Sequence, residues 1–152
     1  MKKNNNRAVK IILWVLTISW LFLIIWESSE IGIATAKTSY RVAEFVIALF
    51  RLPASKISRL DHFLRTIMHF VNFFVLGGFA YAISRITWYH KKYVALWVIL
   101  VCSTVAILDE VKKFFITGRH LSWSEAGLNC IGVVVGVFIM KLFFFLKNHR
   151  KL

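Results

Sequence analysis

Long runs of apolar residues, separated by short polar stretches, dominate the chain. They cover about residues 9–26, 66–84, 93–108 and 127–146. A helix needs roughly 20 mainly apolar residues to cross the hydrocarbon core of a bilayer. The runs show no strand-like alternation and no internal repeat. The pattern therefore predicts an all-α membrane protein with four transmembrane helices, folded as a single domain over residues 1–152.

One further segment, about residues 40–51, has an apolar stripe on one helical face. The stripe residues recur at helical spacing: Val42, Phe45, Val46, Leu49 and Phe50. Charged residues lie off this face, which is typical of a helix that rests at a membrane interface. The same stripe is equally compatible with packing against the four-helix bundle. We therefore expect an amphipathic helix in the first outer loop and leave its partner open.

Composition supports a membrane protein and excludes two other classes. Of the 152 residues 59% are hydrophobic, and the mean hydropathy is +0.67. A chain this apolar is not disordered. Its net charge of +13 would suit a nucleic-acid partner, but such proteins carry their charge on a polar surface. We therefore expect membrane lipids, and no nucleic acid, as partners.

The distribution of charge predicts the orientation of the chain. Basic residues without acidic neighbours occupy the amino-terminal tail, the link between the second and third runs, and the carboxyl end. All the acidic residues fall in the remaining polar regions. Because basic loops stay on the cytoplasmic side, we expect a multi-pass protein of the cell membrane with both termini in the cytoplasm. The acidic regions then face outward.

The second run carries polar residues on one helical face near its outer end. Asp61, Arg65, His69 and Asn72 follow one another at steps of four, four and three. Ionisable groups at this depth are costly and often functional. Asp61 and Arg65 also suit a simple i, i+4 ion pair. Ser58 and Asp61 together resemble a capping box that would open the helix.

The other outer helix ends carry polar residues as well. Asp109 and Glu110 close the third run, and Arg119 follows in the next loop. Ser122 and Glu125 form a second capping box, so Glu125 is either a site residue or the return half of that box. Asn129 lies four residues later, followed by Gly132 and Gly136, whose spacing indicates a close helix contact rather than a ligand site.

These residue types suit a site for an anionic, lipid-linked molecule. His69 is the predicted general acid or base, because its ring can take and give a proton near neutral pH. Asp109 or Glu110 would orient that ring as the second catalytic group. The predicted substrate-binding residues are Arg65, Arg119, Asn129 and Glu125. We expect no cofactor and no resident metal, although a divalent cation at Asp109 and Glu110 is a weaker alternative.

Three stretches of the chain resemble the VanZ-like membrane protein family, which is associated with teicoplanin resistance. The basic residue and His-Phe pair in residues 65–70 are similar to one family motif. Residues 109–119, with Asp-Glu and then Gly-Arg, resemble a second. Residues 125–129 and the two glycines that follow resemble a third. The resemblance implies a role in the cell envelope, with tolerance to teicoplanin and lipoglycopeptides. A lipid-linked cell-wall precursor or a glycopeptide is then the expected partner.

The chain also departs from the family pattern. Thr66 stands where a second basic residue is usual, Asn72 where an acid is, and Phe73 where Tyr is. Lys113 replaces Gln, and Glu125 replaces Asp. The sequence therefore leaves open whether this member catalyses a reaction. The alternative function is a non-enzymatic binding or regulatory membrane protein whose polar residues lock helix ends together.

Overall fold

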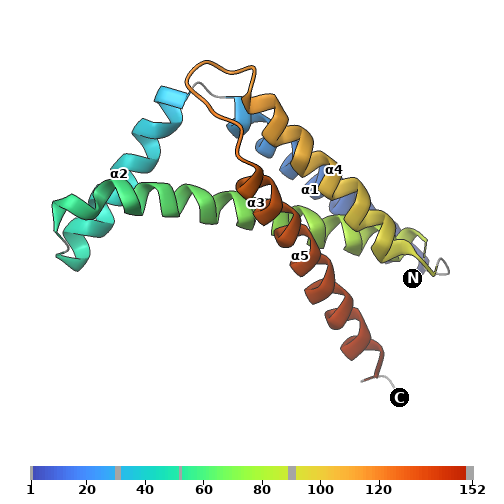
Figure 1. The fold of residues 1–152 in the computed structure, drawn as a ribbon. Helices are drawn as coiled ribbons and strands as arrows, with labels where there is room; N and C mark the ends of the chain where they lie inside the picture. Colours follow the sequence, from blue (N-terminus) through green and yellow to red (C-terminus); the bar gives the residue numbers. More distant parts are fainter. Residues whose placement is uncertain (1, 30–31, 52, 89–91, 150–152) are drawn as a thin grey trace.

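The computed structural model describes residues 2–29, 32–51, 53–88 and 92–149, and every regular element within them is helical (Figure 1). The elements are α1 Lys2–Ser29, α2 Gly32–Phe50, a short 3₁₀ turn Ala54–Lys56, α3 Ile57–Thr87, α4 Val94–Lys113 and α5 Trp123–His149. Four helical segments are long and apolar enough to cross a membrane: Arg7–Ser29, Ile57–Thr87, Val94–Lys113 and Trp123–His149. The all-α fold with four candidate membrane-spanning helices is confirmed.

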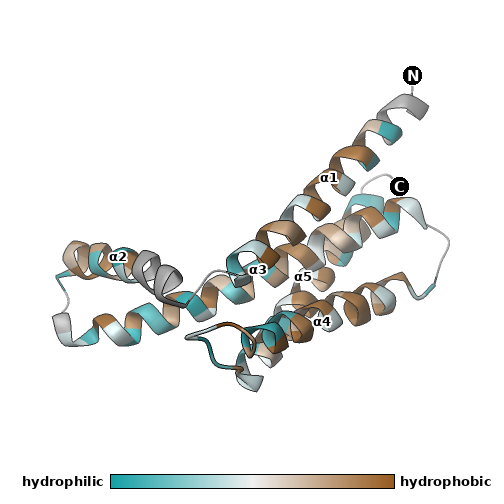
Figure 2. Cartoon of the chain, turned by 90° about the horizontal axis from the view of Figure 1, so that it is seen from above, coloured by the Kyte–Doolittle hydropathy of each residue, from teal (hydrophilic) through white to brown (hydrophobic). Residues whose placement is uncertain are grey.

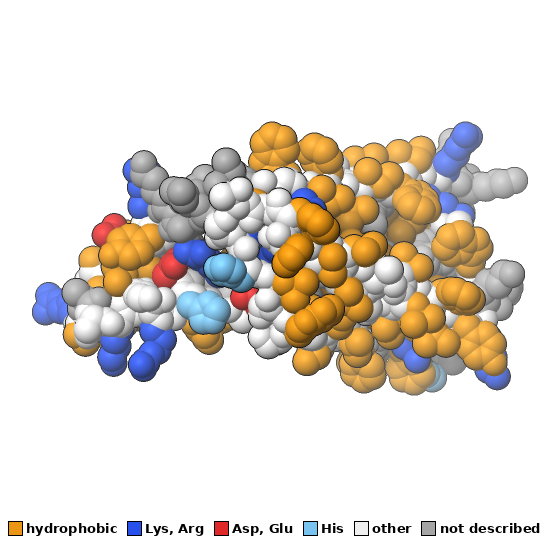
Figure 3. Space-filling model, turned by 45° about the horizontal axis from the view of Figure 1, so that its top comes forward, with side chains coloured by type: hydrophobic (Ala, Val, Ile, Leu, Met, Phe, Trp, Pro, Cys, Tyr) orange, Lys and Arg blue, Asp and Glu red, His pale blue; other side chains and the backbone are white. Residues whose placement is uncertain are grey.

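Large apolar side chains cover the outside of these four helices. Phe22, Trp97 and Phe138, from three different helices, are all exposed. Figure 3 shows hydrophobic side chains as a broad band, with charged groups gathered beyond it at both ends. A soluble monomer rarely exposes apolar surface on this scale. The band is therefore the surface expected to meet the acyl chains of lipids.

The helices continue beyond the apolar runs that predict them. The 31 residues of α3 extend about 46 Å at 1.5 Å per residue, against a hydrocarbon core of about 30 Å. Its first turns carry Asp61 and Arg65, and the last turns of α4 carry Asp109, Glu110 and Lys113. The polar residues near the predicted segment ends are thus held on helix rather than on loops.

The closest helix contact joins α3 and α5. A Cβ atom built on Gly132 would lie 2.6 Å from the Phe70 carbonyl oxygen, and one on Gly77 would lie 2.6 Å from that of Val133. A Cβ on Gly136 would collide with the Phe74 carbonyl. Small residues let helix backbones approach closely in a membrane, where packing drives association. The predicted glycine contact is therefore confirmed.

The buried core extends from this contact to the other helices. It is made of apolar side chains of α1, α3, α4 and α5: Ile24, Phe73, Leu76, Tyr81, Val94, Val98, Cys102, Ala106, Val133 and Val137. Figures 1 and 2 place both chain ends and the α3–α4 connection at one end of the bundle. We call this the basic end, with Arg7, Lys10, Arg85, Lys92 and Lys147 among its described residues. The opposite end, with the α1–α2 and α4–α5 connections, is called the polar end.

Helix α2 packs on α3 beyond the polar end of the bundle (Figure 1). Its one fully buried side chain among those described is Ala43. The predicted apolar stripe faces outward instead, with Val42, Phe45, Leu49 and Phe50 all exposed. The stripe therefore does not pack on the bundle, and a position at the membrane interface stays our prediction for it.

The capping box predicted at Ser58 is wrong. Helix α3 begins at Ile57, directly after the 3₁₀ turn, and its N-cap residue Lys56 makes no side-chain capping bond. Because a 3₁₀ turn leads directly into α3, the first backbone N–H groups of the helix need no side-chain cap. Asp61 pairs instead with Arg65, at 2.7 Å between the carboxylate and the guanidinium. The expected i, i+4 ion pair is therefore present, and a role of Arg65 in binding a ligand stays a prediction.

We expect Gly136→Ala to destabilise the protein by about 1–3 kcal/mol, the usual cost of overpacking a tight contact. The added methyl group would push α5 away from the Phe74 carbonyl. Thermal unfolding of the detergent-solubilised protein, followed by circular dichroism, measures the effect. The matched control is Gly127→Ala on the same helix, where an added Cβ meets nothing within 4 Å. Equal melting temperatures for the two variants would contradict the contact.

Candidate functional site

Polar side chains from four helices and the α4–α5 loop gather at the polar end. They come from the last turns of α1 and α4, the first half of α3 and the start of α5. We call this group the polar cluster: Glu27, Ser28, Asp61, Arg65, His69, Asn72, Asp109, Glu110, Lys112, Lys113, Arg119, Glu125 and Asn129. The residues predicted for the site therefore lie at one end of the structure, together with others that the sequence did not single out.

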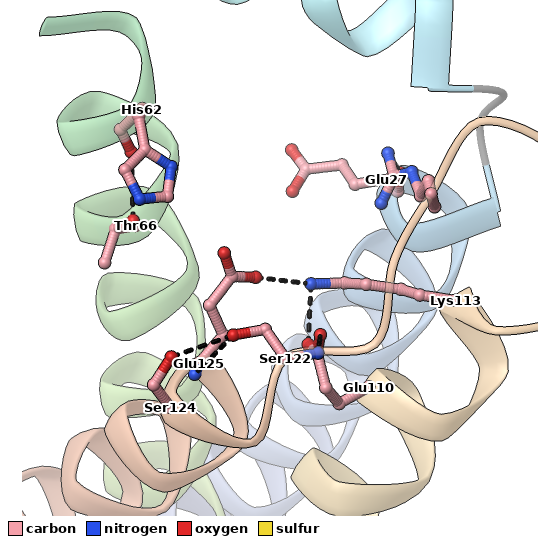
Figure 4. A network of polar contacts seen from close by, with 9 residues as sticks. Glu27, His62, Thr66, Glu110, Lys113, Ser122, Ser124 and Glu125 are labelled. Atoms are coloured by element: carbon pink, nitrogen blue, oxygen red, sulfur yellow. Dashed lines mark hydrogen bonds and ion pairs between the residues drawn. The ribbon is translucent and has the colours of Figure 1, made fainter. Parts of the chain in front are cut away.

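Lys113 is the electrostatic centre of the polar cluster. Its ammonium lies 2.6 Å from the Glu110 carboxylate and 3.0 Å from that of Glu125. Figure 4 shows its side chain reaching from α4 toward α5 between the two acids. The side chains of Lys113 and Glu110 are only 5% and 1% exposed. A buried charge needs such partners, because leaving it unpaired is costly.

The start of α5 is held by a modified form of the predicted capping box. Ser122 Oγ accepts the backbone N–H of Glu125, as predicted for an N-cap residue. The Ser122 backbone N–H donates to Glu110 of α4, 2.9 Å away, rather than to Glu125. Glu110 therefore takes over the return half of the box. The Glu125 carboxylate remains available for Lys113 and for the space beside α3.

Asn72 ties α1 to α3. Its side-chain amide donates to Glu27, 2.8 Å away, and its backbone carbonyl accepts the Trp20 indole N–H at 3.0 Å. A family-typical acid at position 72 would face Glu27 with like charge. The departure at Asn72 thus has a structural consequence here, since it permits the contact with Glu27.

Two cations attach α4 and its loop to the end of α1. Lys112 donates to the Ile25 carbonyl at 2.9 Å and to Ser29 Oγ at 2.6 Å. Arg119 donates to the Glu27 carbonyl at 3.3 Å. The Glu27 carbonyl lies in the last turn of α1, where carbonyls lack helical partners and a cation is favourable. Gly118, at φ +78°, gives the loop the left-handed turn that precedes Arg119.

His69 lies among charged groups but forms no hydrogen bond with the described residues. It interacts electrostatically with Lys113, Glu125, Arg119 and Arg65. Glu125 is the carboxylate among these groups, and the role of Asp109 or Glu110 in orienting the ring stays a prediction. His69 is half-buried, one turn deeper along α3 than Arg65. The imidazole is free to engage a group that enters between α3 and α5.

Three buried polar side chains have no aligned hydrogen-bond partner among the described residues. They are Ser28, Asp109 and Asn129, which are 1%, 6% and 0% exposed. The Ser28 hydroxyl lies beside the Asp109 carboxyl group, close enough to interact but not aligned for a hydrogen bond. Asn129 lies three residues before Gly132, which contacts α3 at Phe70. It is therefore at about the depth of His69.

The described residues contain no group of three His, Cys, Asp or Glu side chains arranged to hold a metal ion. The Asp109 and Glu110 carboxylates face different elements, since Asp109 faces Ser28 of α1 and Glu110 binds Lys113 and Ser122. Adjacent helical residues point in different directions, which explains the divergence. The divalent cation considered for this pair stays a prediction.

Sequence reasoning missed the residues that bridge the helices. Lys113 was noted only as a departure from the family pattern, and Glu27, Ser28 and Lys112 were not assigned to the site. One signal was present for Lys113, because a Lys three residues after Glu110 can pair with it on one helical face. The contacts to α1 had no such signal, since they join positions between 45 and 92 residues apart.

The model of the VanZ/LLP1 family matches residues 13–144, which include the whole polar cluster. No curated protein and no solved structure matches the chain.

We expect Lys113→Met to destabilise the protein by about 3–5 kcal/mol, because it leaves Glu110 buried without its counter-ion. Denaturant or thermal unfolding in detergent measures the loss. Lys112→Met is the matched control on the adjacent residue, since its partners are a carbonyl and a hydroxyl rather than buried carboxylates. A loss of similar size in the control would show that Lys113 has no special role.

Proposed function

The chain belongs to the VanZ/LLP1 family, and we propose that its polar cluster binds or modifies a lipid-linked molecule of the cell envelope at the outer face of the membrane. The activity would contribute to tolerance of teicoplanin and other lipoglycopeptides, as the family association suggests. Membrane insertion itself follows from the family and from the four apolar helices. The site and its ligand are the proposal.

The observation that carries this proposal is the set of buried polar groups without aligned partners. Ser28, Asp109 and Asn129 come from three helices, α1, α4 and α5. A buried polar group without a hydrogen bond costs about 1–3 kcal/mol. A purely structural cluster would be expected to satisfy such groups or to replace them with apolar residues. A ligand with its own donors and acceptors would satisfy them.

His69 and Glu125 supply the acid–base chemistry in this proposal. The imidazole is positioned to take a proton from, or give one to, a group of the ligand. Glu125, which interacts electrostatically with the ring, would orient it. Lys113 holds the Glu125 carboxylate in place at 3.0 Å. Glu125 thus takes the supporting role that sequence alone assigned to Asp109 or Glu110.

Arg65 and Arg119 supply the contacts to an anionic group. Both interact electrostatically with His69, and they approach it from α3 and from the α4–α5 loop. A guanidinium fork matches phosphate and carboxylate oxygens in two-point contacts. A phosphate or carboxylate headgroup beside His69 would therefore meet a cation from each side, with its lipid tail in the adjacent apolar band (Figure 3).

A second candidate function is non-enzymatic, and the Lys113 network favours it. The ion pairs to Glu110 and Glu125, with the cap at Ser122, lock α4 to α5. Such a lock would serve a binding or regulatory protein that performs no chemistry. The two functions differ in what they require of His69, which takes no part in the lock.

Complementation of a deletion strain separates these functions. We expect His69→Ala to abolish the teicoplanin tolerance that the wild-type chain restores, with protein abundance and melting temperature close to wild type. Vancomycin, tested in parallel, reports whether the effect is specific to the lipoglycopeptide. Ser28→Ala should also lose tolerance without losing stability, because it removes only a hydroxyl with no aligned partner.

The control for this experiment is His149→Ala, which removes an exposed imidazole at the basic end. It should leave tolerance unchanged. If His69→Ala lowers abundance and melting temperature together with tolerance, the polar cluster is structural. If it retains full tolerance, His69 has no role in the function.

The proposal also requires the polar end to face outward. His120 is exposed in the α4–α5 loop, and His149 is exposed at the end of α5. We expect a membrane-impermeant thiol reagent, added to intact cells, to label His120→Cys and not His149→Cys. Unsubstituted protein, which has Cys102 and Cys130 within α4 and α5, gives the background. The reverse labelling would overturn the topology and with it the outer site.

A further inference from the structure

An apolar groove lies between α1, α3 and α4, on the side of the bundle toward the basic end. Its volume is about 640 Å³, within the range of roughly 300–1,000 Å³ that is usual for small-molecule sites. Its floor is formed by buried side chains of α3 and α4, among them Leu76, Ile83, Val98 and Cys102. Trp14 of α1 and Trp97 of α4 line its sides. None of these residues belongs to the polar cluster.

The groove lies beside the half of α1 that is nearer the amino terminus, whereas the hydrogen bonds given for its described residues join it to α3 and α4 toward the polar end. Trp20, Glu27 and the Ile25 carbonyl bond to α3 or α4 toward the polar end. Figure 2 shows α1 and α4 diverging from there toward the end that carries the amino terminus. The space between the diverging helices is the groove, with Thr17 and Leu21 of α1 along it.

The length of the groove matches one leaflet of a bilayer. Along α4 it is lined from Val94 to Val105, which corresponds to about 17 Å of helix. Half of the hydrocarbon core is about 15 Å. A helix about 10 Å across and of that length would occupy about 1,300 Å³, twice the volume of the groove. A single acyl chain is therefore a better fit than a helix of a second copy.

The mouth of the groove has the chemistry of a headgroup site. Trp88, Lys92 and Tyr93 lie there, in and beside the α3–α4 connection. Tryptophan and tyrosine favour the membrane interface. The Lys92 ammonium lies 5.7 Å from the centre of the Tyr93 ring, and it is the one charged side chain among the lining residues. In the predicted topology this end meets the anionic cytoplasmic leaflet.

We propose that this groove binds an anionic phospholipid, with one acyl chain between α1, α3 and α4 and its phosphate at Lys92. The lipid comes from the leaflet at the basic end. The site is independent of the polar cluster and of any function that the polar cluster performs. Its binding would hold the half of α1 nearer the amino terminus, whose described apolar side chains are largely exposed.

Native mass spectrometry of the full-length protein in detergent tests the proposal. The probes are dioleoyl phosphatidylglycerol and dioleoyl phosphatidylcholine, which differ only in the headgroup. We expect one phosphatidylglycerol to bind about fivefold more tightly than phosphatidylcholine, the factor typical of one basic residue near an anionic surface. Lys92→Gln should remove this preference and leave phosphatidylcholine binding unchanged. Equal binding of the two lipids to the wild-type protein would overturn the proposal.

Variants that fill the groove test the acyl-chain position. Ala80→Phe fills the groove from α3, and Val101→Trp fills it from an exposed position on α4 where folding tolerates bulk. Both should lower the binding of both lipids. Val134→Trp makes the same substitution as Val101→Trp at a lipid-facing position of α5 outside the groove and should have no effect. Wild-type binding in a folded Val101→Trp variant would overturn the proposal. So would a dimer that this substitution dissociates without changing lipid binding, because a second copy would then occupy the groove.

Discussion

The close contact between α3 and α5 is the constraint on which the rest of the structure depends. Lipid tails are as apolar as the helix surfaces, so membrane helices associate through close packing rather than by escaping water. Gly132 and Gly136 allow that packing, because a side chain at either position would strike the α3 backbone. The contact sets the depth of His69 on α3 and of Asn129 on α5. Helices α1 and α4 then pack around this pair.

Electrostatics organises the polar end in the same way that packing organises the centre. Lys113 neutralises two carboxylates from different helices, and Glu110 also caps the start of α5. Because these groups satisfy one another, they keep the helix ends in place and hold Glu125 toward His69. Ser28, Asp109 and Asn129 are outside this network and lack aligned partners. The division between satisfied and unsatisfied groups separates the framework of the polar end from its proposed ligand site.

The two proposed sites lie at opposite ends of the molecule. One suits the polar headgroup of its ligand, and the other suits an acyl chain. At the polar end, buried polar groups and paired charges suit a headgroup that presents donors and acceptors. Toward the basic end, an apolar groove with one lysine at its mouth suits an acyl chain beneath an anionic phosphate. The position of α1 links the two sites. Its hydrogen bonds with Asn72 and Lys112 complete the polar end. The half of α1 nearer the amino terminus diverges from α4 and lines the groove. A single arrangement of helices therefore produces both sites.

The sequence alone determined the class of fold and the end of the molecule where the polar residues gather. Apolar runs require lipid whatever the tertiary structure, and spacing along one helix places Asp61, Arg65, His69 and Asn72 on one face. The glycine contact was also readable, because only close packing explains paired glycines in an apolar helix. The side-chain contacts between different helices could not be predicted from the sequence. That Lys113 joins Glu110 and Glu125, that Asn72 meets Glu27, and that Glu125 interacts electrostatically with His69 all depend on how helices rotate and cross. Side-chain spacing is a local property, whereas these contacts join segments brought together only by packing.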